Sequence, residues 1–336
     1  MEQSKDTNEN TYSKNSIDAS LRMSLDDVDI NFQDVLGNGS FCRVFRVKLK
    51  HKDGCDYYAL KRLRVSHHNN VVARHHLQQE SALLSLLTGH SHIVHLQGYC
   101  LEAQHGSPFI VTELLTELLE TRVKEWQKGE NHDYLPWNHH PVPSNTEVIT
   151  RLQDICMGVA RGIAYLHSKH ILFRDIKPDN VGFDGKGRVK LFDFGLAVRL
   201  EPPQFLCKER AGTVRYLAPE VAARQAFSYP ADVYSFSIFL WQILTSRLPF
   251  RRELGGSDEI PVDIDDLHFL PPNKRPSLKF VESESLQTLL AKMWNENPEE
   301  RPTFDEIIER LELVVKELTP KLRVRVEPPI DCWWSA

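Results

Sequence analysis

Two aspartates inside short apolar runs constrain this chain more than any other feature of its sequence. Asp175 belongs to the run ILFRDI, and Asp193 belongs to the run LFDFG that follows it. An unpaired carboxylate is costly to bury, so acids at such positions usually have a charged partner, a metal ion or a role in a reaction. Any fold adopted by this chain must supply those partners from elsewhere in the sequence.

The composition is that of a globular protein with one large domain or two lobes, since 41% of the 336 residues are hydrophobic and 26% are charged. The net charge of −5 gives no electrostatic reason to expect a nucleic acid as partner. No apolar run approaches the ~20 residues that span a bilayer, so we expect no membrane insertion. Six cysteines without Cys-x-x-Cys spacing disfavour a zinc site and favour a reducing compartment. We expect a cytoplasmic monomer, with the nucleus as the alternative location.

The first part of the chain changes from a polar segment to a strand pattern. Residues 1–29 are rich in Ser, Asn, Asp and Lys, which predicts a disordered N-terminal tail. From residue 31 the pattern indicates two or three antiparallel strands around a glycine-rich turn, and Asp53–Gly54 predicts a hairpin. Residues 93–102 and 107–115 are predicted to form a further pair of strands.

Glu80 falls on the apolar face of a predicted helix, because Leu77, Glu80, Leu84 and Leu87 recur at helical spacing. Two explanations are open at this point. The glutamate could reach water at the edge of the helix, or it could pair with a buried cation. Lys61, in the predicted strand YALK, is a candidate for that cation.

The remainder is mostly helical. Residues 148–170 and 232–246 have the pattern of helices, the second one buried, and Thr303 with Glu306 forms a capping box before a helix over 304–318. A small strand-rich part followed by a larger helical part predicts an α+β fold.

A glycine-rich turn, Gly37-x-Gly39, lets backbone N–H groups approach a phosphate closely. Alone it is a weak signal, because glycines are common in hairpin turns. A strand follows it instead of a helix, which excludes the dinucleotide-binding motif. Lys61 lies on the next predicted strand.

The order of these features resembles that of the eukaryotic protein kinase domain. A glycine loop, Lys61 and Glu80 are followed by RDIKPDN, DFG, AGTVRYLAPE, DVYSF and RPTF. The joint order is highly specific, and it resembles the serine/threonine type within the tyrosine-kinase-like group. The resemblance implies a two-lobed α+β fold over residues 30–318, with a small lobe at about 30–112, a hinge at 113–116, a large lobe at about 117–318 and a C-terminal tail at 319–336.

The resemblance also implies ATP and Mg²⁺ and assigns roles to residues. Asp175 would be the catalytic base, Lys177 would steady the transferred phosphate, and Asp193 and Asn180 would hold Mg²⁺. Residues implied in ATP binding are Leu36, Gly37, Asn38, Gly39, Val44, Ala59, Lys61, Glu80, Glu113 and Leu115. Thr213 would shape the site for protein substrates with Ser or Thr. Glu220 would pair with Arg301, and Asp232 would hold the backbone of the catalytic loop.

Three positions depart from the family pattern. Phe173 stands where histidine is usual before Arg174, Cys42 replaces the third loop glycine, and Gly182 replaces an apolar residue under the adenine ring. We expect Phe173 to preserve packing and activity. For Cys42, an unreactive loop side chain is favoured over a reactive thiol.

The segment 195–220 contains no serine, and its only threonine is Thr213. Glu209 stands where many relatives carry an activating phosphothreonine. We hypothesise that its carboxylate supplies part of that charge to Arg174, so that activity needs no phosphorylation of this segment. The alternative is a solvated loop acid beside Lys208 and Arg210.

The sequence therefore predicts a protein serine/threonine kinase. Two rivals are a nucleotide-binding pseudokinase and a small-molecule phosphotransferase with a related core. The complete set of catalytic residues argues against the first, and the peptide-site threonine argues against the second. Histidines 67, 68, 75, 76, 132, 139 and 140 fit no compact zinc ligand set, so solvated histidines are favoured.

Overall fold

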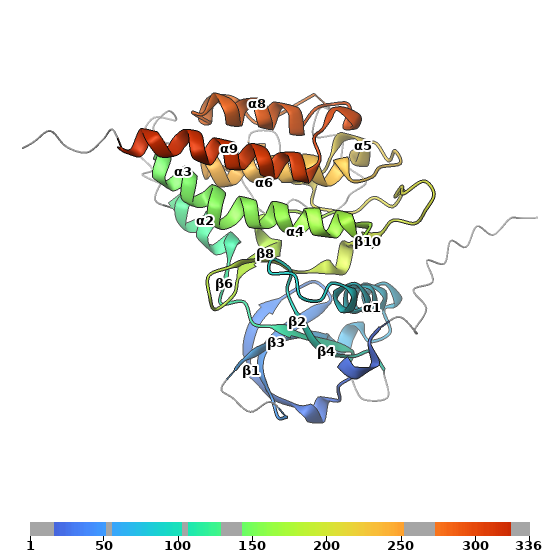
Figure 1. Cartoon of the computed structure of the whole chain (residues 1–336). Coiled ribbons are helices and arrows are strands. Elements are labelled where there is room, and N and C mark those ends of the chain that lie inside the picture. The colour runs from blue at the N-terminus through green and yellow to red at the C-terminus, as the bar shows by residue number, and fades with distance from the viewer. Residues whose placement is uncertain (1–16, 52–55, 103–106, 129–142, 252–272, 324–336) are drawn as a thin grey trace, which may run out of the picture. The chain divides into compact units, whose positions relative to one another are not determined.

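The computed structural model describes residues 17–51, 56–102, 107–128, 143–251 and 273–323. The chain divides into two compact units. Met1–Leu115 together with Phe192–Ala197 form one, here called the strand unit. Thr116–Leu191 and Val198–Ala336 form the other, here called the helical unit. Figure 1 labels the elements of both, and the fold is of the α+β class, as predicted.

The strand unit is built on a five-stranded antiparallel sheet in the order β1-β2-β3-β5-β4. Alternate residues of β2, such as Phe45 and Val47, are buried in a core on one face of the sheet. The antiparallel strands around the glycine turn and the later strand pair are therefore confirmed, whereas the Asp53–Gly54 hairpin lies outside the described residues. The strands are β1 (Val28–Asn38), β2 (Cys42–Leu49), β3 (Tyr58–Leu63), β4 (Leu96–Cys100) and β5 (Phe109–Glu113).

Residues 17–29 form regular structure, so the prediction of a disordered tail is wrong for them, and residues 1–16 lie outside the described residues. Two short helices, η1 (Ala19–Leu21) and η2 (Leu25–Asp27), lead into β1. The backbone N–H of Met23 donates to the carbonyl of Tyr99 in edge strand β4 at 2.9 Å. Met23 and Leu25 pack against the sheet core. The polar composition hid these two apolar anchors.

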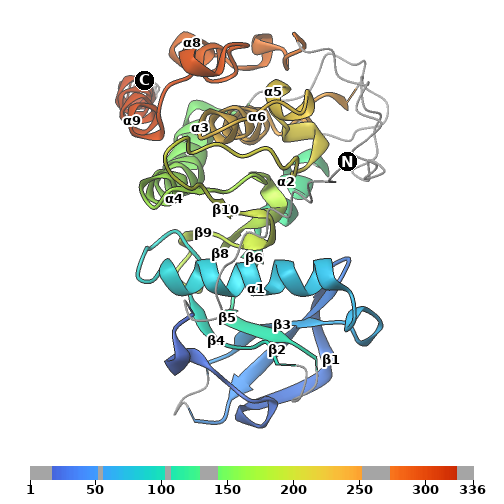
Figure 2. The same cartoon turned by 90° about the vertical axis from the view of Figure 1, so that its right-hand side faces the viewer.

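A long helix, α1 (Val71–Leu86), packs on β4 and β5 in the strand unit (Figure 2). The side chain of Asn70 caps it by accepting from the N–H of Ala73 at 3.0 Å. A short helix, η3 (Val65–His67), links β3 to this cap. The helix predicted around Glu80 is confirmed.

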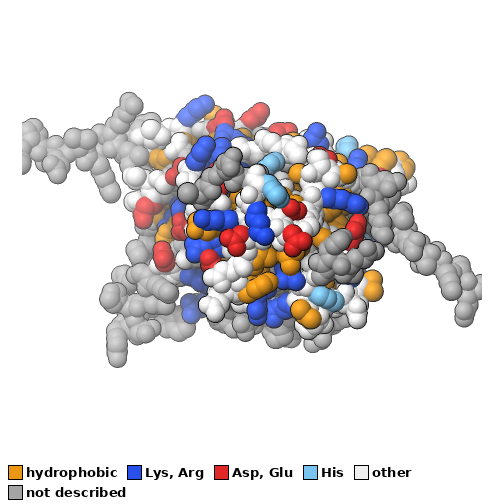
Figure 3. All heavy atoms as spheres, turned by 90° about the horizontal axis from the view of Figure 1, so that it is seen from below, with side chains coloured by type: hydrophobic (Ala, Val, Ile, Leu, Met, Phe, Trp, Pro, Cys, Tyr) orange, Lys and Arg blue, Asp and Glu red, His pale blue; other side chains and the backbone are white. Residues whose placement is uncertain are grey.

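Polar and apolar side chains contact each other on the strand unit. The ring of Tyr57 lies 5.1 Å from the guanidinium of Arg46 and 4.9 Å from Nζ of Lys48. Arg62 similarly lies 5.6 Å from the ring of Phe32. Figure 3 shows basic and hydrophobic side chains next to one another on the face seen from below. These cations cover aromatic rings that would otherwise be more exposed.

The helical unit is organised around α6, whose residues from Ala231 to Thr245 are all buried, as predicted. The predicted helix over 148–170 is also found, interrupted by one π-helical turn, η5. Thr303 and Glu306 make the capping box: Glu306 Oε2 accepts from the Thr303 N–H at 2.7 Å. The last helix continues to Arg323, past the predicted end at 318. The elements are α2 (Leu119–Lys128), α3 (Asn145–Arg151), η5 (Leu152–Cys156), α4 (Met157–Ser168), α5 (Pro219–Ala222), α6 (Pro230–Thr245), α8 (Glu284–Met293) and α9 (Phe304–Arg323).

Short strands and turns in the helical unit position the segment that contains Asp175. That residue lies between strand β7 and the short helix η6, and β7 pairs with β10. A second small sheet has the order β6-β8-β9. The bounds are β6 (Glu117–Leu118), β7 (Ile171–Leu172), η6 (Pro178–Asn180), β8 (Val181–Phe183), β9 (Val189–Leu191), η7 (Phe194–Leu196, in the strand unit), β10 (Val198–Arg199), η8 (Val214–Tyr216), η10 (Leu278–Phe280) and η11 (Pro298–Glu300). Within the described parts of the chain, no helix is both long enough and apolar enough to cross a bilayer.

Candidate active site

Lys61, Glu80 and Asp193 come together in the strand unit. The Nζ of Lys61, on β3, lies 2.7 Å from Oε2 of Glu80 on α1 and 2.7 Å from Oδ1 of Asp193. Glu80 is only 3% exposed, so it is the cation-paired glutamate rather than one that reaches water. One of the two aspartates in apolar runs thus has its partner.

The two carboxylates keep Lys61 charged. Burial by itself would lower the pKa of Lys61, but the charges of Asp193 and Glu80, and their hydrogen bonds, raise it above its ordinary value. The ammonium group is therefore a fixed cation.

The backbone around Asp193 is strained and tied down. Asp193 adopts φ 60°, a left-handed conformation that costs about 1–3 kcal/mol for a residue other than glycine. The side chain of Gln79, on α1, donates to the carbonyl of Ala197 and so anchors the segment 192–197. The Asp193 side chain is 46% exposed, which leaves its carboxylate accessible to a ligand.

Most of the residues predicted to bind ATP lie on the sheet of the strand unit. Val44 of β2 is the cross-strand partner of Gly37 on one side and of Lys61 on the other. Leu36 is 46% exposed, and no atom lies within 4 Å of where a Cβ on Gly37 would be. Seven of the ten lie on strands β1, β2, β3 and β5: Leu36, Gly37, Asn38, Val44, Ala59, Lys61 and Glu113. Glu80 lies on α1. Gly39 and Leu115 lie just beyond β1 and β5.

Glu113 is held at the end of β5. Its backbone N–H donates to the carbonyl of His95 at 2.9 Å, and its Oε1 accepts from the N–H of His95 at 2.8 Å. This double contact fixes the chain just before Leu115. A fixed backbone is what the recognition of an adenine edge by peptide groups would require.

Cys42 begins β2 and is 8% exposed. Burial raises the pKa of its thiol to about 11, and the Lys61 charge lowers it only in part. At neutral pH it is a protonated thiol, which favours the unreactive side chain over the reactive one.

Asp175 has its partners in the helical unit. Its Oδ1 accepts from Oγ1 of Thr213 at 2.6 Å. Its Oδ2 accepts from Nδ2 of Asn180 at 2.8 Å and lies 3.0 Å from Nζ of Lys177. Lys177 also donates to Oγ1 of Thr213 at 2.8 Å. This carboxylate, on a residue that is only 7% exposed, thus has three polar side chains around it. Such contacts hold a carboxylate in one orientation, which a general base requires.

Asp232 holds the backbone next to Asp175. Its two oxygens accept from the N–H groups of Phe173 and Arg174, each at 2.9 Å. Arg174 has φ 69°, so these bonds support a second strained position. The predicted role of Asp232 is confirmed. His167, 2.9 Å from Asp232 Oδ2, was missed, because a histidine near the end of a helix gives no sequence signal for this contact.

Arg174 contacts Glu209. Its Nη1 lies 3.1 Å from both Oε2 and the carbonyl oxygen of Glu209. The arginine side chain is 4% exposed, whereas that of Glu209 is 72% exposed. The carboxylate is therefore both a partner of a buried cation and a solvated acid.

Glu220 and Arg301 form the predicted ion pair, in bidentate geometry with distances of 2.7 and 2.9 Å. Gly212 lies close to the segment that contains Asp175: its φ is 123°, and a Cβ there would lie 2.6 Å from the carbonyl oxygen of Arg174. Only glycine fits this position.

The two residues predicted to hold Mg²⁺, Asp193 and Asn180, are of a suitable type, because Mg²⁺ favours carboxylate and amide oxygens together with substrate phosphates. Asn180 donates through Nδ2 to the carboxylate and carbonyl of Asp175, so its Oδ1 is left as a possible ligand. Among the described residues, no group of three or more His, Cys, Asp or Glu has the geometry of a metal site. Of the histidines considered for zinc, 132, 139 and 140 lie outside the described residues.

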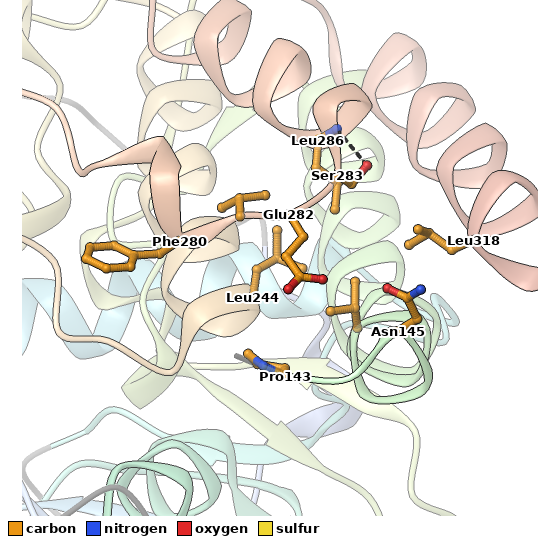
Figure 4. A pocket seen from close by; sticks show the side chains of 10 residues that line it. Pro143, Asn145, Leu244, Phe280, Glu282, Ser283, Leu286 and Leu318 are labelled. Carbon is orange, nitrogen blue, oxygen red and sulfur yellow. Dashed lines mark hydrogen bonds between the residues drawn. The ribbon is translucent and has the colours of Figure 1, made fainter. Parts of the chain in front are cut away.

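A separate small hollow lies in the helical unit (Figure 4). It contains none of the residues discussed above. Its walls come from the starts of α3 and α8 and the ends of α6 and α9, and they include Leu244, Phe280, Leu286 and Leu318.

A strand unit with a lysine–glutamate–aspartate cluster and a helical unit with a supported aspartate are the parts of a protein kinase. The chain belongs to this family: the protein kinase domain matches residues 30–311.

Relatives include "Dual specificity protein kinase shkC" from Dictyostelium discoideum, 33% identical over 302 residues, which are 85% of this chain and 52% of that protein. Two others are from Arabidopsis thaliana. "Serine/threonine/tyrosine-protein kinase HT1" is 30% identical over 84% of this chain and 66% of its own length. "Serine/threonine-protein kinase STY46" is 30% identical over 68% of this chain and 35% of its own length. This chain thus spans between about a third and two thirds of these relatives.

Proposed function

We propose that this protein is a serine/threonine kinase that transfers the γ-phosphate of ATP to hydroxyl groups of protein substrates. The observation that carries the proposal is the Asp175 carboxylate, held by Thr213, Lys177 and Asn180. In this proposal, the domain spans 30–318, with a small lobe at about 30–112, a hinge at 113–116 and a large lobe at about 117–318.

In the nucleotide-binding part, Lys61 contacts the α- and β-phosphates while Glu80 holds it in place. Asp193 and Asn180 supply oxygen ligands for Mg²⁺, which when bound offsets the negative charge of the phosphates. The remaining nucleotide contacts are those assigned above to the glycine loop, Val44, Ala59, Glu113 and Leu115. Gly182, in β8, offers no side chain beneath the adenine, so we expect ATP to bind with an altered preference for inhibitors.

In the transfer step, Asp175 accepts the proton of the substrate hydroxyl as the oxygen attacks the γ-phosphorus. The bond between that phosphorus and the β–γ bridging oxygen breaks, and ADP leaves. Lys177 stabilises the transferred phosphoryl group. The contact of Thr213 with both Asp175 and Lys177 favours substrates with Ser and Thr. Some relatives are named as dual-specificity kinases, so the phosphorylated amino acid must be measured.

The decisive experiment measures phosphate transfer from ATP–Mg²⁺ to a generic basic protein, with identification of the phosphorylated amino acid. We expect phosphoserine and phosphothreonine from the wild type, and a loss of about 10²–10⁴-fold in Asp175→Asn. Nucleotide binding is measured in parallel. Binding without transfer would favour a pseudokinase, and transfer to small alcohols alone would favour the small-molecule phosphotransferase.

We also propose that Glu209 relieves the need for phosphorylation of the segment 195–220. Support comes from its contact with the buried Arg174. Glu209→Ala in unphosphorylated protein should lower the transfer rate by roughly three- to tenfold, a modest factor because Glu209 is exposed. Glu201→Ala, another exposed acid nearby, is the matched control. Equal activity of the two variants would remove the idea.

The cytoplasmic location, the monomeric state and the absence of a nucleic-acid partner stay predictions. Gel filtration with light scattering tests the oligomeric state.

A further inference from the structure

The turn between β1 and β2 has little support of its own. Gly39, Ser40 and Phe41 connect the two strands, and the N–H of Gly39 donates to the carbonyl of Cys42 at 2.9 Å. Glycine adds backbone freedom, which has to be removed before peptide N–H groups can face a phosphate. Something outside the turn must therefore fix its peptide planes.

Arg64, immediately after β3, contacts this turn at two points. Its backbone N–H donates to the carbonyl of Phe41 at 2.9 Å. Its Nη2 donates to the carbonyl of Gly39, also at 2.9 Å. The Nε of the same guanidinium is buried and has no hydrogen-bond partner among the described residues. Within the described residues, the Gly39 carbonyl is thus the hydrogen-bond acceptor of this head group.

The contact with Gly39 has a consequence for Ser40. In a planar trans peptide, the carbonyl oxygen of one residue and the N–H of the next point in opposite directions. Because the Gly39 carbonyl faces Arg64, the Ser40 N–H faces away from it. That N–H donates to no described residue. It is a backbone donor held in a fixed direction, as an anion-binding turn requires.

Phe41 is held from another side. Its ring packs edge-on against His67 of η3 at 5.4 Å and against His76 of α1 at 6.4 Å. The residue that follows Ser40 is thus anchored through both its carbonyl and its ring. Ser40 itself is exposed.

We propose that Arg64 is a positioning residue for ATP: it fixes the glycine-rich turn so that the Ser40 N–H donates to a nucleotide phosphate. This inference rests on the proposed function. Arg64 acts through the backbone of Gly39 and Phe41 and does not itself touch the nucleotide.

The test compares Arg64→Ala, Arg64→Lys and Arg62→Ala. Arg62 lies on the same strand region, but its guanidinium lies over Phe32 rather than against the turn. Dissociation constants are measured by calorimetry for adenosine and for a non-hydrolysable ATP analogue with Mg²⁺. KM for ATP and kcat are measured on a protein substrate.

For Arg64→Ala we expect about tenfold weaker binding of the ATP analogue and a matching rise in KM, the value of one charge-assisted hydrogen bond. Adenosine, which has no phosphates, should bind as it does to the wild type. Arg64→Lys should recover part of the affinity, and Arg62→Ala should change neither ligand.

Equal weakening of adenosine and the ATP analogue would overturn the inference, because it would show general damage to the strand unit. So would an Arg64→Ala variant indistinguishable from Arg62→Ala. A wild type that binds the analogue without transferring phosphate would overturn the proposed activity, and the binding comparison would still decide the role of Arg64. A wild type that binds neither ligand would overturn both.

Discussion

Breaking the ion pair between Glu220 and Arg301 is predicted to destabilise the helical unit strongly. The Arg301 side chain is fully buried and that of Glu220 is 7% exposed, so Glu220→Ala leaves a charge that water cannot reach. Removing one partner of a buried pair costs about 3–5 kcal/mol. Arg301 also donates to the carbonyls of Asn295 and Pro230. These two acceptors remain in the variant, which places the expected loss near the lower limit, about 3 kcal/mol.

The assay is urea unfolding followed by tryptophan fluorescence. The three tryptophans among the described residues, Trp126, Trp241 and Trp294, belong to the helical unit, so their signal reports that unit. The matched control is Glu312→Ala, which breaks a pair with Arg161 whose side chains are 44% and 45% exposed. Such a pair contributes at most about 1 kcal/mol. If Glu220→Ala lowered the free energy of unfolding no more than Glu312→Ala, the argument from burial would be refuted.

Three further predictions concern other positions. Gly212→Ala should lower kcat at least ~100-fold, because the added Cβ would displace the catalytic loop. The control is Gly185→Ala, which should leave kcat unchanged because no atom lies within 4 Å of its added Cβ. An unchanged kcat in both variants would contradict the steric argument. Cys42, with its pKa raised to about 11, should be alkylated at pH 8 about 100-fold more slowly than in unfolded protein, which mass spectrometry measures. Because the folded protein keeps this thiol protonated while the unfolded chain loses the proton, the free energy of unfolding should fall as the pH rises from 9 to 11, which a pH series of unfolding measures. Rapid alkylation of the folded protein would count against both expectations. Met23→Ala should cost about 1–2 kcal/mol and speed hydrogen exchange in β4, and unchanged exchange there would show that residues 17–27 do not support the sheet.

The chemistry of the candidate site could be predicted from the order of motifs. Lys61 was expected to pair with Glu80, and it does. Its contact with Asp193 was not predicted. Local rules also succeeded at the start of α9, because a capping box involves residues only three positions apart. Such contacts have a sequence signature, because each requires particular residue types at particular positions.

Other features were decided by tertiary contacts. Residues 17–29 have the composition of a disordered segment, but Met23 finds a place against the sheet core and a backbone acceptor on edge strand β4. Composition averages over a segment and cannot register two anchors whose partners lie on distant strands.

Arg64 shows the same limit at the candidate site. Its partners are two backbone carbonyls. Because every residue has a carbonyl, no sequence pattern identifies the contact. The sequence alone determined which residue types and motifs are present and in what order. The tertiary structure decided which peptide groups those side chains reach, because that depends on how the strands bring distant backbone segments together.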